Sequence, residues 1–135
     1  MSTVTVFGAG AWGSTMAQVL SDAGNDVLLW GRSKDVIAEI NSAHTNKKYL
    51  GKHELPLSLQ ATTDLAQAFA HSHIYVLAIP AQQLRLTLEE WKPFFSTDSI
   101  IVSTLKGIEI STQMRMTEVI EDVLGPSAIA IITGP

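Results

Sequence analysis

The sequence predicts an α/β fold in which helices cover both faces of a doubly wound, mainly parallel sheet of six strands. Short apolar runs rich in β-branched and aromatic residues recur along the 135 residues, and apolar residues at helical spacing lie between them. The run from His73 to Ile79 is nearly continuous, which is typical of a parallel strand buried on both faces. Two halves of three strands each favour the strand order 3-2-1-4-5-6.

The composition is that of one globular domain over residues 1–135. Hydrophobic residues make up 46% of the chain and charged residues 16%, enough to bury a sizeable core. The apolar runs have the length of strands rather than the roughly 20 residues of a membrane span, so we expect no membrane insertion. Met1 to Thr3 lead directly into the first expected strand without a secretory leader, which favours the cytoplasm.

Cysteine content and charge exclude further classes. The chain has no cysteine, so it offers neither a disulfide framework nor a thiolate metal site. Its net charge of -4, without basic clusters, argues against nucleic acid as the main partner. An anionic ligand must therefore be held by local groups.

The stretch V-T-V-F-G-A-G-A-W-G, from Val4 to Gly13, carries the strongest functional signal. Gly8, Gly10 and Gly13 have G-x-G-x-x-G spacing between a strand and a helix. In a Rossmann-type βαβ unit, the first glycine permits the turn, the second lets the backbone approach a pyrophosphate, and the third lets helix and strand pack closely. The amides at the helix start would hold the phosphates. A purely structural glycine turn in another α/β domain is the alternative.

The helix after this turn is marked by periodic apolar residues and by a glycine at its end. Gly24 occupies the position of a C-terminal cap. The helical stripe consists of Trp12, Met16, Val19, Leu20 and Ala23.

The second expected strand, Asp26 to Trp30, ends where a dinucleotide's adenosine half would lie. NAD-selective folds place a carboxylate near this point, about 20 residues after the glycines, but Arg32 stands here with Ser33 beside it. A guanidinium suits a 2′-phosphate, so NADP is favoured over NAD. A solvated surface arginine is the alternative. Ser33 is also a candidate N-cap for the next helix, whose apolar stripe is Val36, Ile37 and Ile40.

Residues 41–57 predict a long loop of the kind that often covers a site, because polar residues, Gly51 and Pro56 break any period. Tyr49 could pack on a cofactor ring or anchor this loop. His44 and His53 have no partner at metal-ligand spacing, so we expect exposed histidines and no metal site.

The next expected elements are a strand at 59–62, a helix through Phe69 capped by Thr63 or Asp64, and the strand at 73–79 that Pro80 ends. A loop leaving a parallel strand at its carboxyl end overlies the ligand crevice of open α/β sheets. Pro80 to Gln83 are therefore predicted to form a wall of the cofactor site. The helix that follows carries Leu84, Leu88 and Trp91 on one face, and Trp91 is assigned to the core.

The fifth strand is expected at 99–104 and the sixth at 128–133, joined by a helix that Ser111 caps and Gly125-Pro126 end. Lys106 follows the fifth strand, beside the crevice. A cation there can hold an anionic part of a substrate or cofactor, and a surface lysine is the alternative.

Several stretches resemble the amino-terminal domain of the bacterial NAD(P)-dependent glycerol-3-phosphate dehydrogenases. They occur in that family's order across the whole chain, and the tryptophan within the glycine motif and the K-G-I-E segment are more specific than the glycines alone. The stretches are V-F-G-A-G-A-W-G at 6–13, V-L-L-W-G-R at 27–32, N-K-K-Y-L at 46–50, A-I-P-A-Q at 78–82, S-T-L-K-G-I-E at 103–109, and the closing T-G-P.

The resemblance implies reduction of dihydroxyacetone phosphate to sn-glycerol 3-phosphate with NADPH or NADH, for phospholipid synthesis. Residues implied in cofactor contact are Ala11, Trp12, Arg32, Ser33, Tyr49 and Lys106; Lys106 and Gly134 would contact substrate. Two departures bear on cofactor affinity and loop geometry, since Ala11 stands where serine is common and Gly51 where proline often follows the leucine.

The resemblance further implies a helical carboxyl-terminal domain that supplies most substrate contacts and, beyond Pro135, the proton-donating lysine. We expect no catalytic residue within the 135 residues and at most trace activity for this chain alone. A homodimer of the full-length protein stays open. The alternatives are another reductase of the same two-domain architecture, a stand-alone NADP-binding sensor, and a cofactor-free interaction domain.

Overall fold

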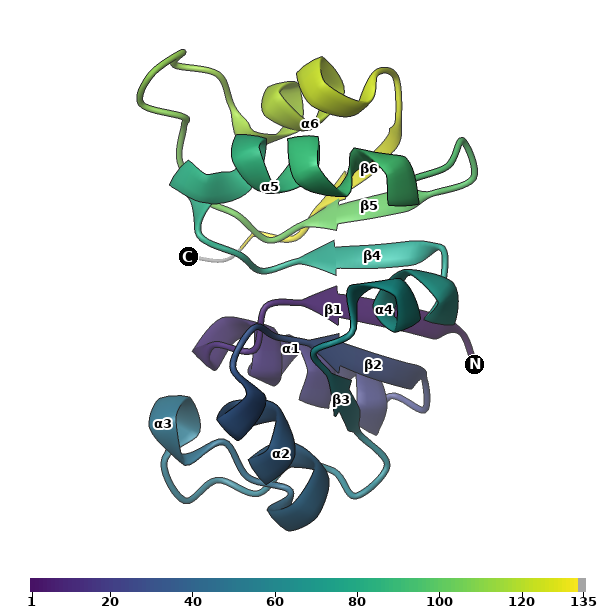
Figure 1. Cartoon of the computed structure of the whole chain (residues 1–135), viewed down its shortest axis with the longest axis vertical. Helices are drawn as coiled ribbons and strands as arrows, with labels where there is room; N and C mark the ends of the chain where they lie inside the picture. The colour runs from purple at the N-terminus through teal and green to yellow at the C-terminus, as the bar shows by residue number, and fades with distance from the viewer. Residues whose placement is uncertain (134–135) are drawn as a thin grey trace.

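A computed structural model describes residues 1–133 and confirms the predicted architecture. Six strands form one sheet in the order β3-β2-β1-β4-β5-β6, and all five pairings are parallel (Figure 1). The strands are β1 (Thr3–Phe7), β2 (Asp26–Trp30), β3 (Gln60–Thr62), β4 (Ile74–Leu77), β5 (Ile100–Ser103) and β6 (Ala128–Ile131).

Helices connect successive strands. The α-helices are α1 (Ala11–Asp22), α2 (Lys34–Ala43), α3 (Lys47–Leu50), α4 (Leu65–His71), α5 (Leu84–Trp91) and α6 (Met116–Leu124), and the 3-10 helices are η1 (Ala81–Gln83) and η2 (Lys92–Phe94). None of the helices described for residues 1–133 has the length and apolar character needed to cross a membrane.

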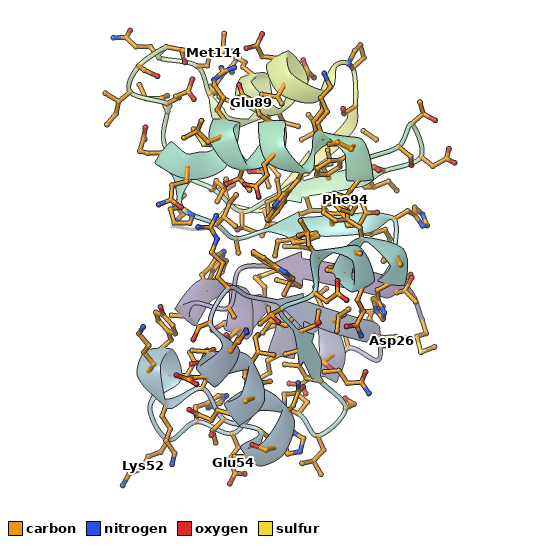
Figure 2. All side chains as sticks on the ribbon, in the orientation of Figure 1. Asp26, Lys52, Glu54, Glu89, Phe94 and Met114 are labelled. Carbon is orange, nitrogen blue, oxygen red and sulfur yellow. The ribbon has the colours of Figure 1, made fainter. Side chains whose placement is uncertain are left out.

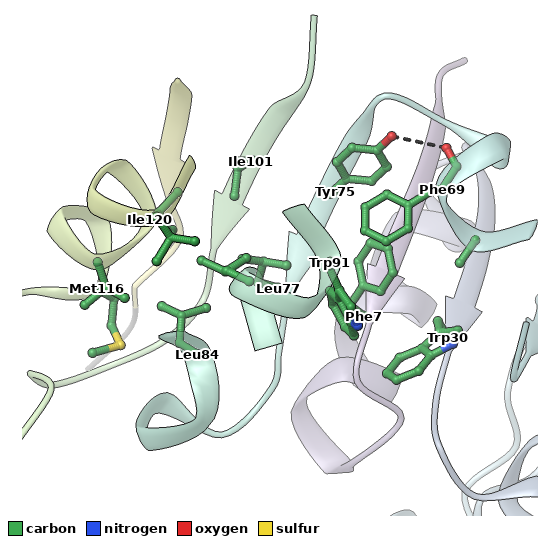
Figure 3. Packing of buried hydrophobic residues seen from close by; sticks show 14 residues of the cluster. Phe7, Trp30, Phe69, Tyr75, Leu77, Leu84, Trp91, Ile101, Met116 and Ile120 are labelled. Atoms are coloured by element: carbon green, nitrogen blue, oxygen red, sulfur yellow. Dashed lines mark hydrogen bonds between the residues drawn. The ribbon is translucent and has the colours of Figure 1, made fainter. Parts of the chain in front are cut away.

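Alternating residues of the central strands build two cores, one on each face of the sheet. On β1, Val6 packs with α1 and α2, whereas Phe7 packs with α4 and α5. The second core contains a group of packed aromatic rings: the ring centroid of Phe7 lies 4.8 Å from that of Phe69 and 4.9 Å from that of Trp91 (Figure 3). Trp91 is thus a core residue, as predicted.

The predicted helix ends are largely confirmed. The Ser33 hydroxyl accepts a hydrogen bond from the Val36 amide at the start of α2, and Asp64, rather than Thr63, caps α4. Gly24 and Gly125 follow α1 and α6 with φ of 92° and 82°, a region that glycine enters without steric cost.

The prediction of one long loop over 41–57 was wrong. Helix α2 continues to Ala43, α3 lies within the segment, and Thr45 forms an antiparallel bridge with Glu54. The Glu39 carboxylate organises the turn between the two helices, because it accepts hydrogen bonds from the Thr45 hydroxyl at 2.7 Å and the Lys47 amide at 2.8 Å. Beyond the turn, Lys52 and Glu54 project outward (Figure 2).

The two histidines of this segment differ. His53 is exposed, as predicted, and its ring lies 2.6 Å from the Gln18 side chain. His44 is half-buried instead, and it caps the C-terminus of α2 in the left-handed conformation with φ of 56°.

Ser111 does not cap α6, which begins five residues later at Met116. The Glu118 carboxylate accepts a hydrogen bond from the Arg115 amide at 3.1 Å and closes the start of the helix instead. Residues 105–115 form a folded loop, which an antiparallel bridge between Ile108 and Arg115 closes. An N-cap must immediately precede the first helical turn, and this loop holds Ser111 away from that position.

The predicted stripe of α1 also needs correction, because Trp12 is 49% exposed and Val19 56% exposed. Gly13, Met16 and Ala17 face the sheet. Their smaller or flexible side chains allow α1 to lie close against β1.

Candidate functional site

A cleft of about 610 Å³ lies at the carboxyl ends of β1, β4 and β5, where the sheet order reverses. Open α/β sheets bind ligands at this point. The lining residues are Gly8 to Gly13, Trp30 to Ser33, Val36, Tyr49, Ala78 to Ala81, Gln83, Thr87 and Thr104 to Lys106.

Two glycines of the first turn are required by the packing. Gly8 has φ of 118°, and a Cβ atom there would lie 2.3 Å from the Ala78 carbonyl oxygen. A Cβ atom on Gly13 would lie 1.6 Å from the Gly8 carbonyl oxygen. Both positions therefore exclude any side chain, and they bring α1 and the end of β4 against the turn.

Gly10 serves a different purpose. A Cβ atom built on it meets nothing within 4 Å, and the residue lines the cleft at the start of α1. Gly10 occupies the N-cap position but has no side chain with which to cap the amides of the first turn. These amides and the positive end of the helix dipole suit a phosphate, so the geometry fits a dinucleotide's pyrophosphate.

Arg32 and Ser33 lie together at one side of the cleft, just after β2. Arg32 is exposed, and the ion pairs found within residues 1–133 do not include it. The Ser33 hydroxyl accepts the Val36 amide hydrogen bond and can still donate to a ligand.

Tyr49 reaches the cleft from α3 and is 45% exposed. The segment is fixed to the fold by Asn46, whose amide nitrogen donates to the Ala9 carbonyl and to the Ser14 hydroxyl, both at 3.0 Å. Asn46 and the buried Leu55 anchor this segment, and a cofactor contact for Tyr49 stays a prediction.

The opposite wall comes from the ends of β4 and β5. Pro80 and Ala81 lie on one strand end, and Leu105 and Lys106 on the other. The Thr104 hydroxyl donates to the Leu77 carbonyl at 2.7 Å and ties the two strand ends together.

The charge of the cleft differs from that of the chain. Among the described lining residues, Arg32 and Lys106 are charged, both are cations, and neither Asp nor Glu is present. The chain as a whole has a net charge of -4. No group of His, Asp and Glu suited to a metal ion is found within residues 1–133. The two cationic lining residues of the cleft favour an anionic ligand.

Comparison with known proteins identifies the family. The model of the NAD-dependent glycerol-3-phosphate dehydrogenase N-terminus matches residues 3–135. The chain belongs to this family. Glycerol-3-phosphate dehydrogenase [NAD(P)+] of Streptomyces avermitilis is 48% identical over 132 residues, which are 96% of this chain and 39% of the relative. The enzyme of the same name from Corynebacterium glutamicum strain R is 47% identical over 137 residues, covering all of this chain and 41% of the relative.

Solved structures of glycerol-3-phosphate dehydrogenases share the fold. The enzyme from Coxiella burnetii superimposes with a TM-score of 0.90 at 27% identity, covering 98% of this chain and 41% of the other. The Saccharomyces cerevisiae enzyme gives a TM-score of 0.83 at 28% identity, over 97% and 40% of the two chains. This chain thus spans about 40% of the relatives it matches, and it corresponds to the NAD-binding amino-terminal part of the family.

The structure brings most of the predicted site residues of this dehydrogenase family to one cleft: Gly8, Gly10, Ala11, Trp12, Gly13, Arg32, Ser33, Tyr49, Pro80 and Lys106. Of the predicted wall from Pro80 to Gln83, all but Gln82 line the cleft. Sequence reasoning missed Val36, Thr87 and Thr104 as lining residues. Thr104 directly follows β5, so its strand-end position was the signal available, whereas Val36 and Thr87 sit within helices and gave none.

Two predictions fall on the end of the chain, where Gly134 and Pro135 lie outside the described residues. The substrate contact of Gly134 therefore stays a prediction. The proton-donating lysine was placed beyond Pro135, so no part of the described cleft tests it, and it also stays a prediction.

Proposed function

We propose that this chain is the cofactor-binding half of an oxidoreductase that interconverts dihydroxyacetone phosphate and sn-glycerol 3-phosphate with NAD(P)H. The observation that carries the proposal is an open glycine turn at the start of α1, in a cleft whose two charged lining residues are cations. Membership of the glycerol-3-phosphate dehydrogenase family supports the substrate class.

Each wall of the cleft is assigned a part of the cofactor. Gly10, with the amides of Ala11 and Trp12, holds the pyrophosphate at the start of α1. Arg32 pairs with the 2′-phosphate of NADPH through its planar fork of donors, and the Ser33 hydroxyl donates beside it. The absence of a carboxylate from the described lining supports NADPH over NADH.

The nicotinamide half lies towards β4 and β5 in this proposal. Pro80 and Tyr49 flank the bound cofactor and exclude water from its surface. A bound NAD(P)H would supply the hydride that reduces the substrate carbonyl. Lys106 stands beside the reacting end and neutralises an anionic part of cofactor or substrate.

The protonation of the carbonyl oxygen is assigned to a lysine beyond Pro135, in a carboxyl-terminal helical domain that would also bind the substrate phosphate. The relatives' greater length supports this part of the proposal. Gly134 is proposed to begin the substrate-binding segment. The full-length protein is proposed to be cytoplasmic, to act in phospholipid synthesis, and to be able to form a homodimer.

A stand-alone NADP-binding sensor is the second candidate, because the described lining contains neither His nor a carboxylic acid. The two candidates differ in a single assay. Oxidation of NADPH by the natural protein that depends on dihydroxyacetone phosphate supports the dehydrogenase, whereas NADPH binding without turnover supports the sensor.

The first experiment is a calorimetric titration of the chain with NADPH and NADH. Arg32→Ala should weaken NADPH binding about ten- to hundredfold, because a hydrogen-bonded charge pair contributes about 1.5–3 kcal/mol, and should change NADH binding little. Lys34→Ala removes an exposed cation two residues away that does not line the cleft, and it is the matched control. Equal losses for both cofactors would refute the role of Arg32.

A further inference from the structure

We propose that Gln82, Arg85 and Glu109 form a clamp that positions Lys106 in the cleft. This inference rests on the proposed function and adds three positioning residues to it. Gln82 and Glu109 end the sequence stretches A-I-P-A-Q and K-G-I-E, and the structure brings these stretches into direct contact.

Gln82 pairs with the backbone of the loop after β5. Its side-chain nitrogen donates to the Ile108 carbonyl at 2.8 Å, and its side-chain oxygen accepts from the Ile110 amide at 3.0 Å. Gln82 belongs to η1, which continues the β4 wall of the cleft. One side chain thus fastens the loop of one wall to the other wall.

Arg85, in the first turn of α5, also holds the loop after β5. Its Nε atom lies 3.1 Å from one oxygen of the Glu109 carboxylate, and its Nη2 atom lies 3.1 Å from the other. Its Nη1 atom donates to Asp122 on α6 at 2.6 Å, and the Thr112 hydroxyl donates to Glu109. A bidentate guanidinium-carboxylate pair fixes both distance and orientation.

Glu109 is the least accessible member of the clamp, with its side chain 8% exposed. The hydrogen bonds from Arg85, and then from Thr112, hold the pKa of the Glu109 carboxyl below its ordinary value, so the carboxylate is charged at neutral pH. A buried carboxylate of this kind must keep its guanidinium partner. The loop is therefore not free to leave α5.

Hydrogen bonds hold the chain on both sides of Lys106. Before it, the Thr104 hydroxyl donates a hydrogen bond to the Leu77 carbonyl. After it, the Ile108 carbonyl accepts a hydrogen bond from the Gln82 side chain. Gly107 lies between Lys106 and Ile108 with φ of 95°, a conformation that few residues other than glycine adopt readily. If the clamp opened, this glycine would let the Lys106 side chain leave the cleft.

The test uses Gln82→Ala and Glu109→Gln in this chain, each alone and combined with Lys106→Ala. NADPH affinity is measured by calorimetry, and backbone order at Lys106 and Gly107 is measured by ¹⁵N relaxation without ligand. Glu118→Gln is the matched control, because Glu118 also pairs with an arginine, at 2.8 Å, but lies outside the clamp. Gln82→Ala keeps the test valid if Glu109→Gln does not fold, since Gln82 is exposed.

Each clamp variant should increase motion at Lys106 and weaken NADPH binding by about tenfold, the scale of one charged hydrogen bond. In the Lys106→Ala background, the same changes should alter affinity by less than about twofold, because coupled residues are not additive. If the backbone at Lys106 and Gly107 stays ordered in both clamp variants, the clamp is refuted. If the clamp variants weaken NADPH binding as much in the Lys106→Ala background as in the unchanged chain, the action of the clamp through Lys106 is refuted. If the unchanged chain binds no NADPH, the proposed function fails first and the positioning role with it.

Discussion

The glycine turn allows the requirements of folding to be separated from those of binding by two single substitutions. Gly10→Ala and Gly13→Ala each add one methyl group, three residues apart in the same turn. The methyl group at Gly13 would lie 1.6 Å from the Gly8 carbonyl oxygen, whereas that at Gly10 would meet nothing within 4 Å.

The stability effects follow from these distances. Gly13→Ala forces α1 away from the turn that follows β1, and overpacking of this severity costs about 3 kcal/mol or more. For a domain of this size, we expect Tm to fall by about 10 °C. Gly10 has φ of -79° and ψ of -168°, which alanine adopts easily. Gly10→Ala stabilises the fold by reducing the freedom of the unfolded chain and destabilises it by replacing a glycine N-cap with alanine. The two effects nearly offset each other, so the unfolding free energy of Gly10→Ala should change by less than about 1 kcal/mol.

The variant with the smaller loss of stability, Gly10→Ala, is the one expected to lose cofactor binding through a direct effect on the site. Gly10→Ala should weaken NADPH binding about ten- to hundredfold, because the methyl group occupies the space through which the phosphate approaches the helix amides. Scanning calorimetry and NADPH titration on the same samples measure both quantities. A Gly10→Ala chain that binds NADPH as tightly as the unchanged one would refute the assignment of this turn to the pyrophosphate. A Gly13→Ala chain with an unchanged Tm would refute the packing argument.

Two further predictions concern the second half of the domain. Leu88→Ala should lower the unfolding free energy by about 2–5 kcal/mol in urea titrations, because Leu88 is fully buried, whereas Leu86→Ala on the exposed face of the same helix should change it by less than about 0.5 kcal/mol. Similar losses for both would contradict the burial pattern of α5. The stability contributed by the Arg85–Glu109 pair should be fully present above about pH 4.5, the ordinary pKa of the carboxyl, and be lost as the pH falls through its lower native pKa. Unfolding free energies of the unchanged chain and Glu109→Gln should therefore converge in acid, and a constant difference down to about pH 2 would contradict this.

Local signals predicted the fold. The alternation of apolar runs with helical stripes indicated two halves of three strands each, and that architecture favours the observed strand order. The segment 41–57 was mispredicted because side-chain hydrogen bonds determine its structure, and the spacing of apolar residues does not reveal them. The Glu39 carboxylate and the buried Asn46 side chain hold this polar stretch together.

The candidate site was predicted to the extent that it lies at strand ends. Arg32, Pro80 and Lys106 follow different strands, and parallel strands place their carboxyl ends at one edge of the sheet. The contact between Gln82 and Ile108 could not be predicted in this way. The two residues are 26 positions apart, and their pairing depends on how the loop after β5 folds back over η1.

The distribution of charge explains how an acidic chain can hold an anionic cofactor. A net charge of -4 acts at long range, but charges more than about 8 Å away are largely screened at physiological ionic strength. At the cleft, the local groups include two cationic lining residues and the amide end of α1. The clamp adds to this arrangement, because it satisfies the Glu109 carboxylate with Arg85 and keeps that negative charge out of the cleft lining. Local placement of charge, rather than the overall balance, therefore determines which ligand the domain accepts.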